Sequence, residues 1–127
     1  MKNLLTVTTV VEAPLGLSML VWPPLPVTLL LGIPLDTPAG LIIGRIYGAS
    51  VVALAVGCWL ARHDGQSRAA TGLVAGLLLY NIAAVAVLAS AGIVSALVGV
   101  LLWPAVVIHT ALTAWCVACL RARPGRE

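Results

Sequence analysis

The sequence predicts an all-α membrane protein in which four transmembrane helices form a compact bundle, as a single domain over residues 1–127. Of its residues, 61% are hydrophobic and only 9% are charged, whereas an average soluble protein has about 25% charged residues. A membrane span needs about 20 mostly apolar residues. Four stretches meet this requirement, residues 4–22, 41–60, 70–90 and 95–120.

The first stretch, residues 4–22, has the start of a span and also some features of a secretory signal. Lys2 precedes the apolar run, as it does in both cases. However, Glu12 and Pro14 interrupt the run, and no small-residue cleavage site precedes Trp22. We therefore expect an uncleaved first transmembrane helix.

A proline-rich segment, residues 23–35, follows the first span. It is apolar but too short to cross a membrane, and its prolines prevent one continuous helix. We expect a short interfacial or re-entrant segment that caps one face of the bundle. The following Asp36 and Thr37 are candidates for the N-cap of the second span.

Glycines recur every fourth residue at the start of the second span. Gly40, Gly44 and Gly48 share one stripe of the helix, and small residues at this spacing let a second helix approach closely in lipid. Arg45 lies beside this stripe, so we expect its side chain to face protein rather than lipid. An ionisable residue within a span is a candidate functional residue.

The third and fourth spans have similar features. Gly72 and Gly76 repeat the four-residue spacing and predict a further close helix contact. The connection near residues 91–93 is predicted to be tight and is uncharged. The fourth span, residues 95–120, is long enough to tilt, and Pro104 predicts a bend one turn before His109.

The basic residues indicate the topology. In a four-span arrangement one side of the membrane receives all of them outside the spans, namely Lys2, Arg62, Arg68, Arg121, Arg123 and Arg126. The positive-inside rule then predicts a multi-pass protein of the cell (inner) membrane with both termini in the cytoplasm. With few aromatic residues and basic residues confined to span ends, nucleic acid is not an expected partner.

Polar side chains that lipid should exclude occur in every predicted span. At about 1.5 Å per residue, Glu12 lies roughly 12 Å from the cytoplasmic side and His109 roughly 16 Å. Arg45 lies roughly 22 Å from that side, and it is the natural partner of Glu12 because an unpaired charge in lipid is costly. The candidate ligand-binding residues are Glu12, Arg45, Tyr47, Tyr80, Asn81 and His109.

Two interpretations of these polar residues remain open. One is a structural cluster that sets helix register without contacting a ligand, because polar side chains often join membrane helices. The other is a pocket open toward the outer face, below the proline-rich cap, in which these groups bind or protonate a ligand.

The cysteines and histidines do not predict a metal site or identify a cofactor. Cys58, Cys116 and Cys119 lie in apolar stretches, where a cysteine usually acts as a small hydrophobe. A lone CxxC, as in residues 116–119, is a weak indication of soft-metal binding. Haem with two histidine ligands is disfavoured because His63 lies in a predicted loop.

The layout resembles a known family. Four short spans, a proline-rich first outer connection and Gly44-Arg45-Ile46-Tyr47-Gly48 are similar to the DoxX-like group of small bacterial membrane proteins. The resemblance implies a four-helix membrane fold. For some members of that group it implies an accessory role in quinone-linked sulfur oxidation, and it assigns no catalytic residue here.

Three functions are consistent with these features. The first is a small membrane protein that binds a hydrophobic molecule of lipid or quinone type, or that serves as an accessory subunit of a membrane complex. The expected partners are membrane lipid, a hydrophobic small molecule, and further copies of the chain or a larger membrane complex. The second is a membrane-embedded enzyme in which Glu12 and His109 perform acid–base chemistry on a lipid-like substrate. The third is a proton-coupled transporter that acts as an oligomer, with Glu12 as the proton carrier. Whether the protein is an enzyme stays open.

Overall fold

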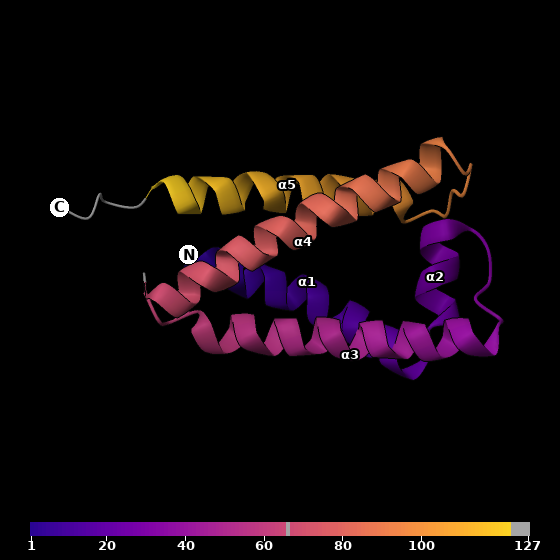
Figure 1. The fold of residues 1–127 in the computed structure, drawn as a ribbon, viewed down its shortest axis with the longest axis horizontal. Helices are drawn as coiled ribbons and strands as arrows, with labels where there is room; N and C mark the ends of the chain where they lie inside the picture. The colour runs from indigo at the N-terminus through magenta and orange to yellow at the C-terminus, as the bar shows by residue number, and fades with distance from the viewer. Residues whose placement is uncertain (66, 123–127) are drawn as a thin grey trace.

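The computed structural model describes residues 1–65 and 67–122 and is built from helices alone in these ranges. In chain order the helices are α1 (Lys2–Val21), α2 (Pro24–Leu31), α3 (Pro38–Ala61), α4 (Arg68–Ile93) and α5 (Leu102–Arg121) (Figure 1). Within the described ranges, all of these except α2 are long and apolar enough to cross a membrane. The predicted fold class, an all-α protein with four membrane-spanning helices, is confirmed.

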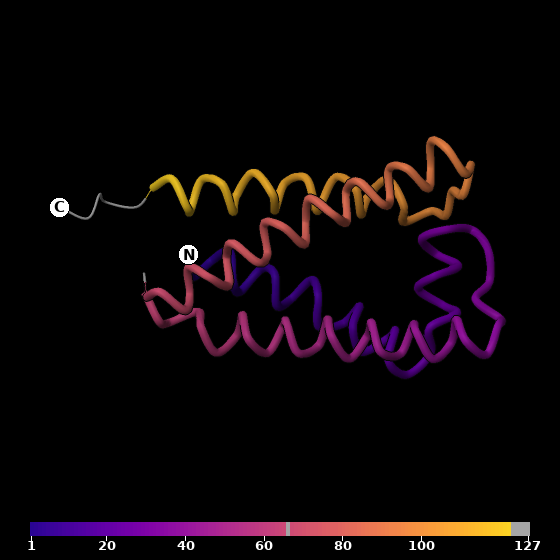
Figure 2. Tube along the Cα trace, viewed as in Figure 1, coloured from indigo at the N-terminus to yellow at the C-terminus, as the bar shows by residue number. Residues whose placement is uncertain are grey.

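The four long helices are arranged as two pairs. α1 packs along α3 and α4 packs along α5, whereas the two pairs contact each other much less. In Figure 2 the start of α1, the α3–α4 connection and the end of α5 lie together at one end of the bundle. We call this the terminal end. The opposite end, formed by α2 and the α4–α5 connection, is called the α2 end.

The α1–α3 pair is close because glycines meet at the contact. A Cβ atom added to Gly48 would lie 2.5 Å from the backbone nitrogen of Leu20 and 2.7 Å from the carbonyl oxygen of Gly16. One added to Gly44 would lie 2.9 Å from Pro23 Cβ. The predicted close approach of a second helix is thus confirmed at Gly48. Gly44 instead meets Pro23 and Leu35, which lie in connections, and Gly40 contacts the segment that precedes α3.

The second glycine repeat does not have the predicted role. A Cβ atom added to Gly72 or Gly76 would meet no other heavy atom within 4 Å. Both residues are exposed on α4. The expected close helix contact is wrong here because the side of α4 that packs on its neighbours presents larger residues, Val74 and Leu77.

The hydrophobic core lies toward the terminal end. All four long helices contribute to it, and its buried members are Leu4, Leu5, Cys58, Val74, Leu77, Leu112 and Cys116. Cys58 and Cys116 are free thiols buried in this cluster, and Cys119 is half-buried beside it. Van der Waals packing of these side chains holds the two pairs together at this end, because lipid supplies no hydrophobic driving force between helices.

The proline-rich segment forms the short helix α2, which stands crosswise to α3 in Figure 1. Proline is tolerated here because Pro24 lies in the first turn, where a backbone N–H has no intrahelical partner. The carbonyl oxygens at the other end of α2 are used by the α4–α5 connection: the N–H of Leu101 donates to Leu29 O (2.9 Å) and the N–H of Gly99 donates to Leu30 O (3.0 Å).

The fourth span begins later than predicted. The sequence predicts its start at residue 95, but residues 94–101 form an irregular connection and α5 starts at Leu102. The predicted tight turn near residues 91–93 is also wrong, because α4 continues to Ile93. The physical reason is that this connection forms hydrogen bonds to α2, one of them from the N–H of Gly99. Only glycine fits at this position, because any side chain would collide with the Leu29 carbonyl group.

The basic residues outside the long apolar segments gather at the terminal end. Lys2 begins α1, Arg62 follows α3, Arg68 begins α4 and Arg121 ends α5. The other two residues of the predicted basic cluster, at positions 123 and 126, lie outside the described residues. The charge asymmetry therefore follows the long axis of the bundle.

Candidate functional site

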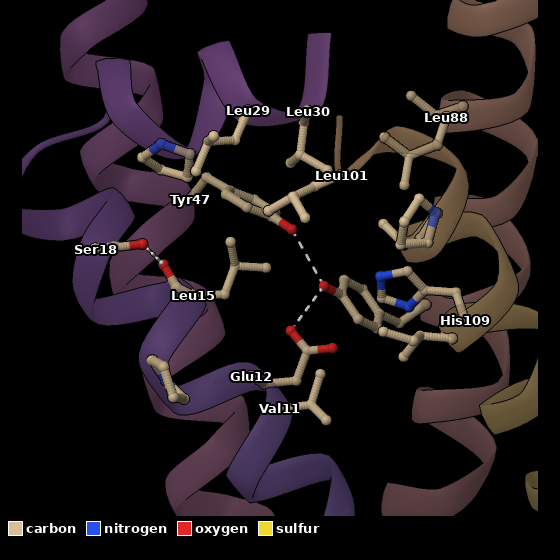
Figure 3. A pocket seen from close by; sticks show the side chains of 18 of the residues that line it. Val11, Glu12, Leu15, Ser18, Leu29, Leu30, Tyr47, Leu88, Leu101 and His109 are labelled. Carbon is tan, nitrogen blue, oxygen red and sulfur yellow. Dashed lines mark hydrogen bonds between the residues drawn. The ribbon is translucent and has the colours of Figure 1, made fainter. Parts of the chain in front are cut away.

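A cavity of about 640 Å³ occupies the α2 end of the bundle, between the two helix pairs and against α2. Most of its wall is apolar. The wall residues come from all five helices and the α4–α5 connection, and they are Val11, Glu12, Pro14, Leu15, Ser18, Leu25, Pro26, Leu29, Leu30, Tyr47, Tyr80, Ala83, Ala84, Val87, Leu88, Leu101, Pro104, Ala105, Ile108 and His109. Figure 3 shows Glu12, Tyr47 and His109 pointing toward one another across it.

Two tyrosines and a glutamate form a directed chain of hydrogen bonds. The Tyr80 hydroxyl donates to Glu12 Oε2 at 3.1 Å, and the hydroxyls of Tyr47 and Tyr80 are 3.1 Å apart. A phenol has one proton to donate. Because Tyr80 gives its proton to Glu12, Tyr47 must be the donor to Tyr80.

Only one of the two carboxyl oxygens of Glu12 takes part in these hydrogen bonds. Its side chain is completely buried, and Oε1 has no hydrogen-bond partner among the described residues. The hydroxyl of Thr8, one turn earlier on α1, is buried and unpartnered in the same way, but Thr8 does not line the cavity. A buried polar atom without a partner costs about 1–3 kcal/mol, so a ligand group that reached Oε1 would recover part of that cost.

Asn81 determines which nitrogen of His109 carries a proton. Asn81 Nδ2 donates to the carbonyl oxygen of Leu77 at 2.7 Å, which leaves Oδ1 as the acceptor that faces His109 Nδ1, also at 2.7 Å. His109 Nδ1 must therefore be protonated. In the neutral ring Nε2 is then an acceptor, and it makes no hydrogen bond within the described part of the chain.

The ring of His109 is held from a second side. It meets the Tyr80 ring edge-on, with centroids 5.7 Å apart and an interplanar angle of 80°. His109 is buried, with only 6% of its surface exposed, and it lines the cavity. Asn81 is absent from the wall and acts only by orienting His109.

The polar groups of the cavity lie at one level. At about 1.5 Å per residue, Glu12 is about 15 Å from the start of α1, Tyr80 about 18 Å from the start of α4, and His109 about 18 Å from the end of α5. The core cluster lies below this level, toward the terminal end. The polar residues thus form the floor of an apolar cavity near the middle of the bundle.

The expected ion pair between Glu12 and Arg45 is wrong. Within the described residues Glu12 has no ion pair, and its hydrogen-bond partner is Tyr80. Arg45 is exposed and does not line the cavity. The reason is rotational: Gly44 is buried against Pro23, and the next residue points about 100° away from it around the helix.

The other candidate residues come together. Glu12, Tyr47, Tyr80 and His109 line the cavity, and Asn81 supports His109. Sequence reasoning missed Tyr80 as the partner of Glu12 and did not single out Ser18. The Ser18 hydroxyl lines the cavity but is already used, because it donates to the carbonyl oxygen of Leu15 at 2.8 Å.

Metal ligands do not gather in the described residues, where no three His, Cys, Asp or Glu side chains are placed to hold an ion together. Comparison with protein-family models, with curated proteins and with solved structures found no match for the chain.

Proposed function

We propose that this protein binds a hydrophobic small molecule of lipid or quinone type in the cavity at the α2 end. The observation that carries the proposal is the combination of an apolar wall and a convergent polar floor in a space of about 640 Å³. Small-molecule sites usually measure about 300–1,000 Å³ and have mainly apolar walls with a few well-placed polar groups. A ligand tail would contact the wall, and its polar group would meet Glu12 and His109.

The experiment is to identify what the protein retains. The protein is purified in mild detergent, and the extracted lipids are compared by mass spectrometry with those of its Ala84→Trp and Ala86→Trp variants. Ala84 lines the cavity, whereas Ala86 is exposed on the same helix. We expect one lipid-like molecule to be enriched with the wild-type protein and Ala86→Trp and to be lost from Ala84→Trp. Equal lipid content in all three proteins would contradict the proposal.

A membrane-embedded enzyme is the second candidate, because Glu12 and His109 line the same cavity and each has one acid–base atom without a hydrogen-bond partner among the described residues, Oε1 and Nε2. Such a pair could move a proton on a bound lipid, for example in a double-bond isomerisation. An enzyme of this kind should introduce deuterium into its substrate in heavy water. The Glu12→Gln variant should then show no exchange, and a wild-type protein without any exchange would exclude this function.

We also propose that the terminal end faces the cytoplasm of the inner membrane. The support is the group of basic residues there, Lys2, Arg62, Arg68 and Arg121, and the positive-inside rule. A fluorescent reporter that matures only in the cytoplasm should be bright when fused after residue 127. An alkaline phosphatase fused at that position and active there would reverse the orientation.

A further inference from the structure

We infer that the ligand of this cavity is an uncharged lipid with a free hydroxyl group, of the alcohol or phenol type, and that it binds with this hydroxyl on the polar floor between Glu12 and His109. The inference rests on the proposed function and adds the chemistry of the ligand. It follows from three features of the cavity: the tautomer of His109, the unpartnered oxygen of Glu12 and the lack of a cation in the wall.

The tautomer of His109 requires a donor on the ligand. Leu77 O accepts from the Asn81 amide, the Asn81 carbonyl oxygen accepts from His109 Nδ1, and Nε2 is left as an acceptor. A neutral ring oriented in this way cannot donate to a ketone, an ester or an ether. A ligand that satisfies Nε2 must therefore carry an O–H or an N–H.

The free oxygen of Glu12 is satisfied by a hydroxyl in either of its protonation states. Oε2 accepts from Tyr80, and Oε1 is buried without a partner. As a carboxylate, Oε1 accepts from a donor, and as a carboxylic acid it donates to an acceptor. With Glu12 protonated at Oε1, a hydroxyl accepts from that oxygen and gives its one proton to His109 Nε2, so it bridges the two residues. Beside a Glu12 carboxylate, the single proton reaches only one of the two acceptors.

The cavity wall excludes anionic headgroups. Among the described residues no Lys or Arg lines the cavity, since Arg45 points away from it. A phosphate or carboxylate on the ligand would be buried beside Glu12 without a counter-charge, and such burial is far more costly than that of a neutral group. An ammonium group could bond to both acceptors, but it would also enter the middle of the membrane as an ion. A hydroxyl donates to His109 Nε2 and accepts from a protonated Glu12 without this cost.

The shape of the cavity places the tail. From His109 to Leu101 the wall rises about 12 Å along α5. Above the floor this wall is formed by alanines, prolines and aliphatic side chains, and Leu25, Pro26 and Leu29 of α2 are part of it. A single apolar tail therefore extends from the floor toward α2.

The test uses matched probes with one tail and different head groups. Wild-type protein is placed in nanodiscs of phosphatidylcholine, which has no free hydroxyl, and binding of radiolabelled tetradecanol is measured against empty nanodiscs. Unlabelled tetradecanol, tetradecyl methyl ether, tetradecylamine and tetradecane are the competitors. We expect the alcohol to compete about tenfold better than the ether or the hydrocarbon, as one hydrogen bond of the expected strength implies.

Three variants separate recognition from folding. Asn81→Leu removes the group that orients His109, and His109→Phe keeps a ring but removes Nε2, so in both the preference of alcohol over ether should fall to about one. Thr113→Val is the control, because the Thr113 hydroxyl donates to the backbone oxygen of His109 and not to its ring. This variant should keep the wild-type preference.

The outcomes separate the inference from the function on which it rests. Equal competition by alcohol and ether in the wild-type protein would contradict the inference that the ligand carries a hydroxyl. The proposal that the cavity binds a lipid would still stand. Stronger competition by the amine would replace the hydroxyl with a cationic head group. Absence of specific binding by every probe would overturn the inference and the proposed function together.

Discussion

The two ends of the bundle use the same four helices in opposite ways. At the terminal end all four long helices contribute to a buried core that includes Leu4, Leu77 and Leu112. At the α2 end the two pairs line a half-open cavity of about 640 Å³. The polar floor formed by Glu12, Tyr80 and His109 lies between these two regions.

The difference between the two ends shows that a small helix bundle can have a packed core at one end and a cavity at the other. Side chains such as Leu4, Leu77 and Leu112 fill the space between the pairs at the terminal end, whereas at the α2 end the side chains that line the cavity leave space between the pairs. α2 and the connection bonded to it add a further wall to that space. We therefore expect stability to depend mainly on the terminal end and on the α1–α3 contact.

The largest effect should come from separating α1 and α3. In Gly48→Leu the new side chain would collide with backbone atoms of Leu20 and Gly16, which cannot rotate away. We expect the free energy of unfolding to fall by about 4 kcal/mol or more, which exceeds the usual cost of overpacking. This free energy is measured by reversible unfolding in mixed micelles. Gly72→Leu is the control and should cost little, because that position faces open space.

The second-largest effect should come from shortening a leucine side chain, and it should differ between the two ends of the bundle. Leu77 is fully buried in the core, so Leu77→Ala should lower the free energy of unfolding by about 3 kcal/mol. Leu15 is only half-buried and lines the cavity, so Leu15→Ala should lower the free energy of unfolding by about 1 kcal/mol or less, because it removes fewer packing contacts. The same unfolding measurement compares them. Similar losses at both positions would mean that the two ends are equally well packed.

Larger side chains should also affect the two ends differently. Ala70 is fully buried near the terminal end, and Ala70→Leu should cost about 2 kcal/mol through overpacking. Ala84→Leu should leave the free energy of unfolding nearly unchanged and weaken probe binding, since it fills part of the cavity. Unfolding and probe binding are measured on the same samples. Destabilisation by Ala84→Leu without loss of binding would contradict the assignment of the cavity.

The smallest effect tests the outer surface at the terminal end. Gly72→Ala adds a methyl group where no atom lies within 4 Å and replaces glycine in a helix. We expect stabilisation by up to about 1 kcal/mol, the usual difference between the two residues in a helix interior. Gly16→Ala is the contrasting variant and should destabilise, because its Cβ would lie 2.9 Å from the backbone nitrogen of Val52.

Much of the fold could be predicted from local properties of the chain. Apolar runs of about 20 residues identify the spans, and the prolines after Trp22 identify the short α2 segment. The start of α5 could not be predicted in this way, since residues 94–101 are as apolar as a span. Their hydrogen bonds to Leu29 and Leu30 are long-range contacts that leave no local pattern.

The sequence by itself determined which polar residues lie in the spans and at what depth, because the rise along a helix is constant. This placed Glu12, Asn81 and His109 near one level. Only the tertiary structure decided their partners, since depth does not specify how each helix is rotated against its neighbours. The burial of Gly44 and Gly48 against α1 and Pro23 turns Arg45 outward, and the Tyr80 hydroxyl takes its place beside Glu12.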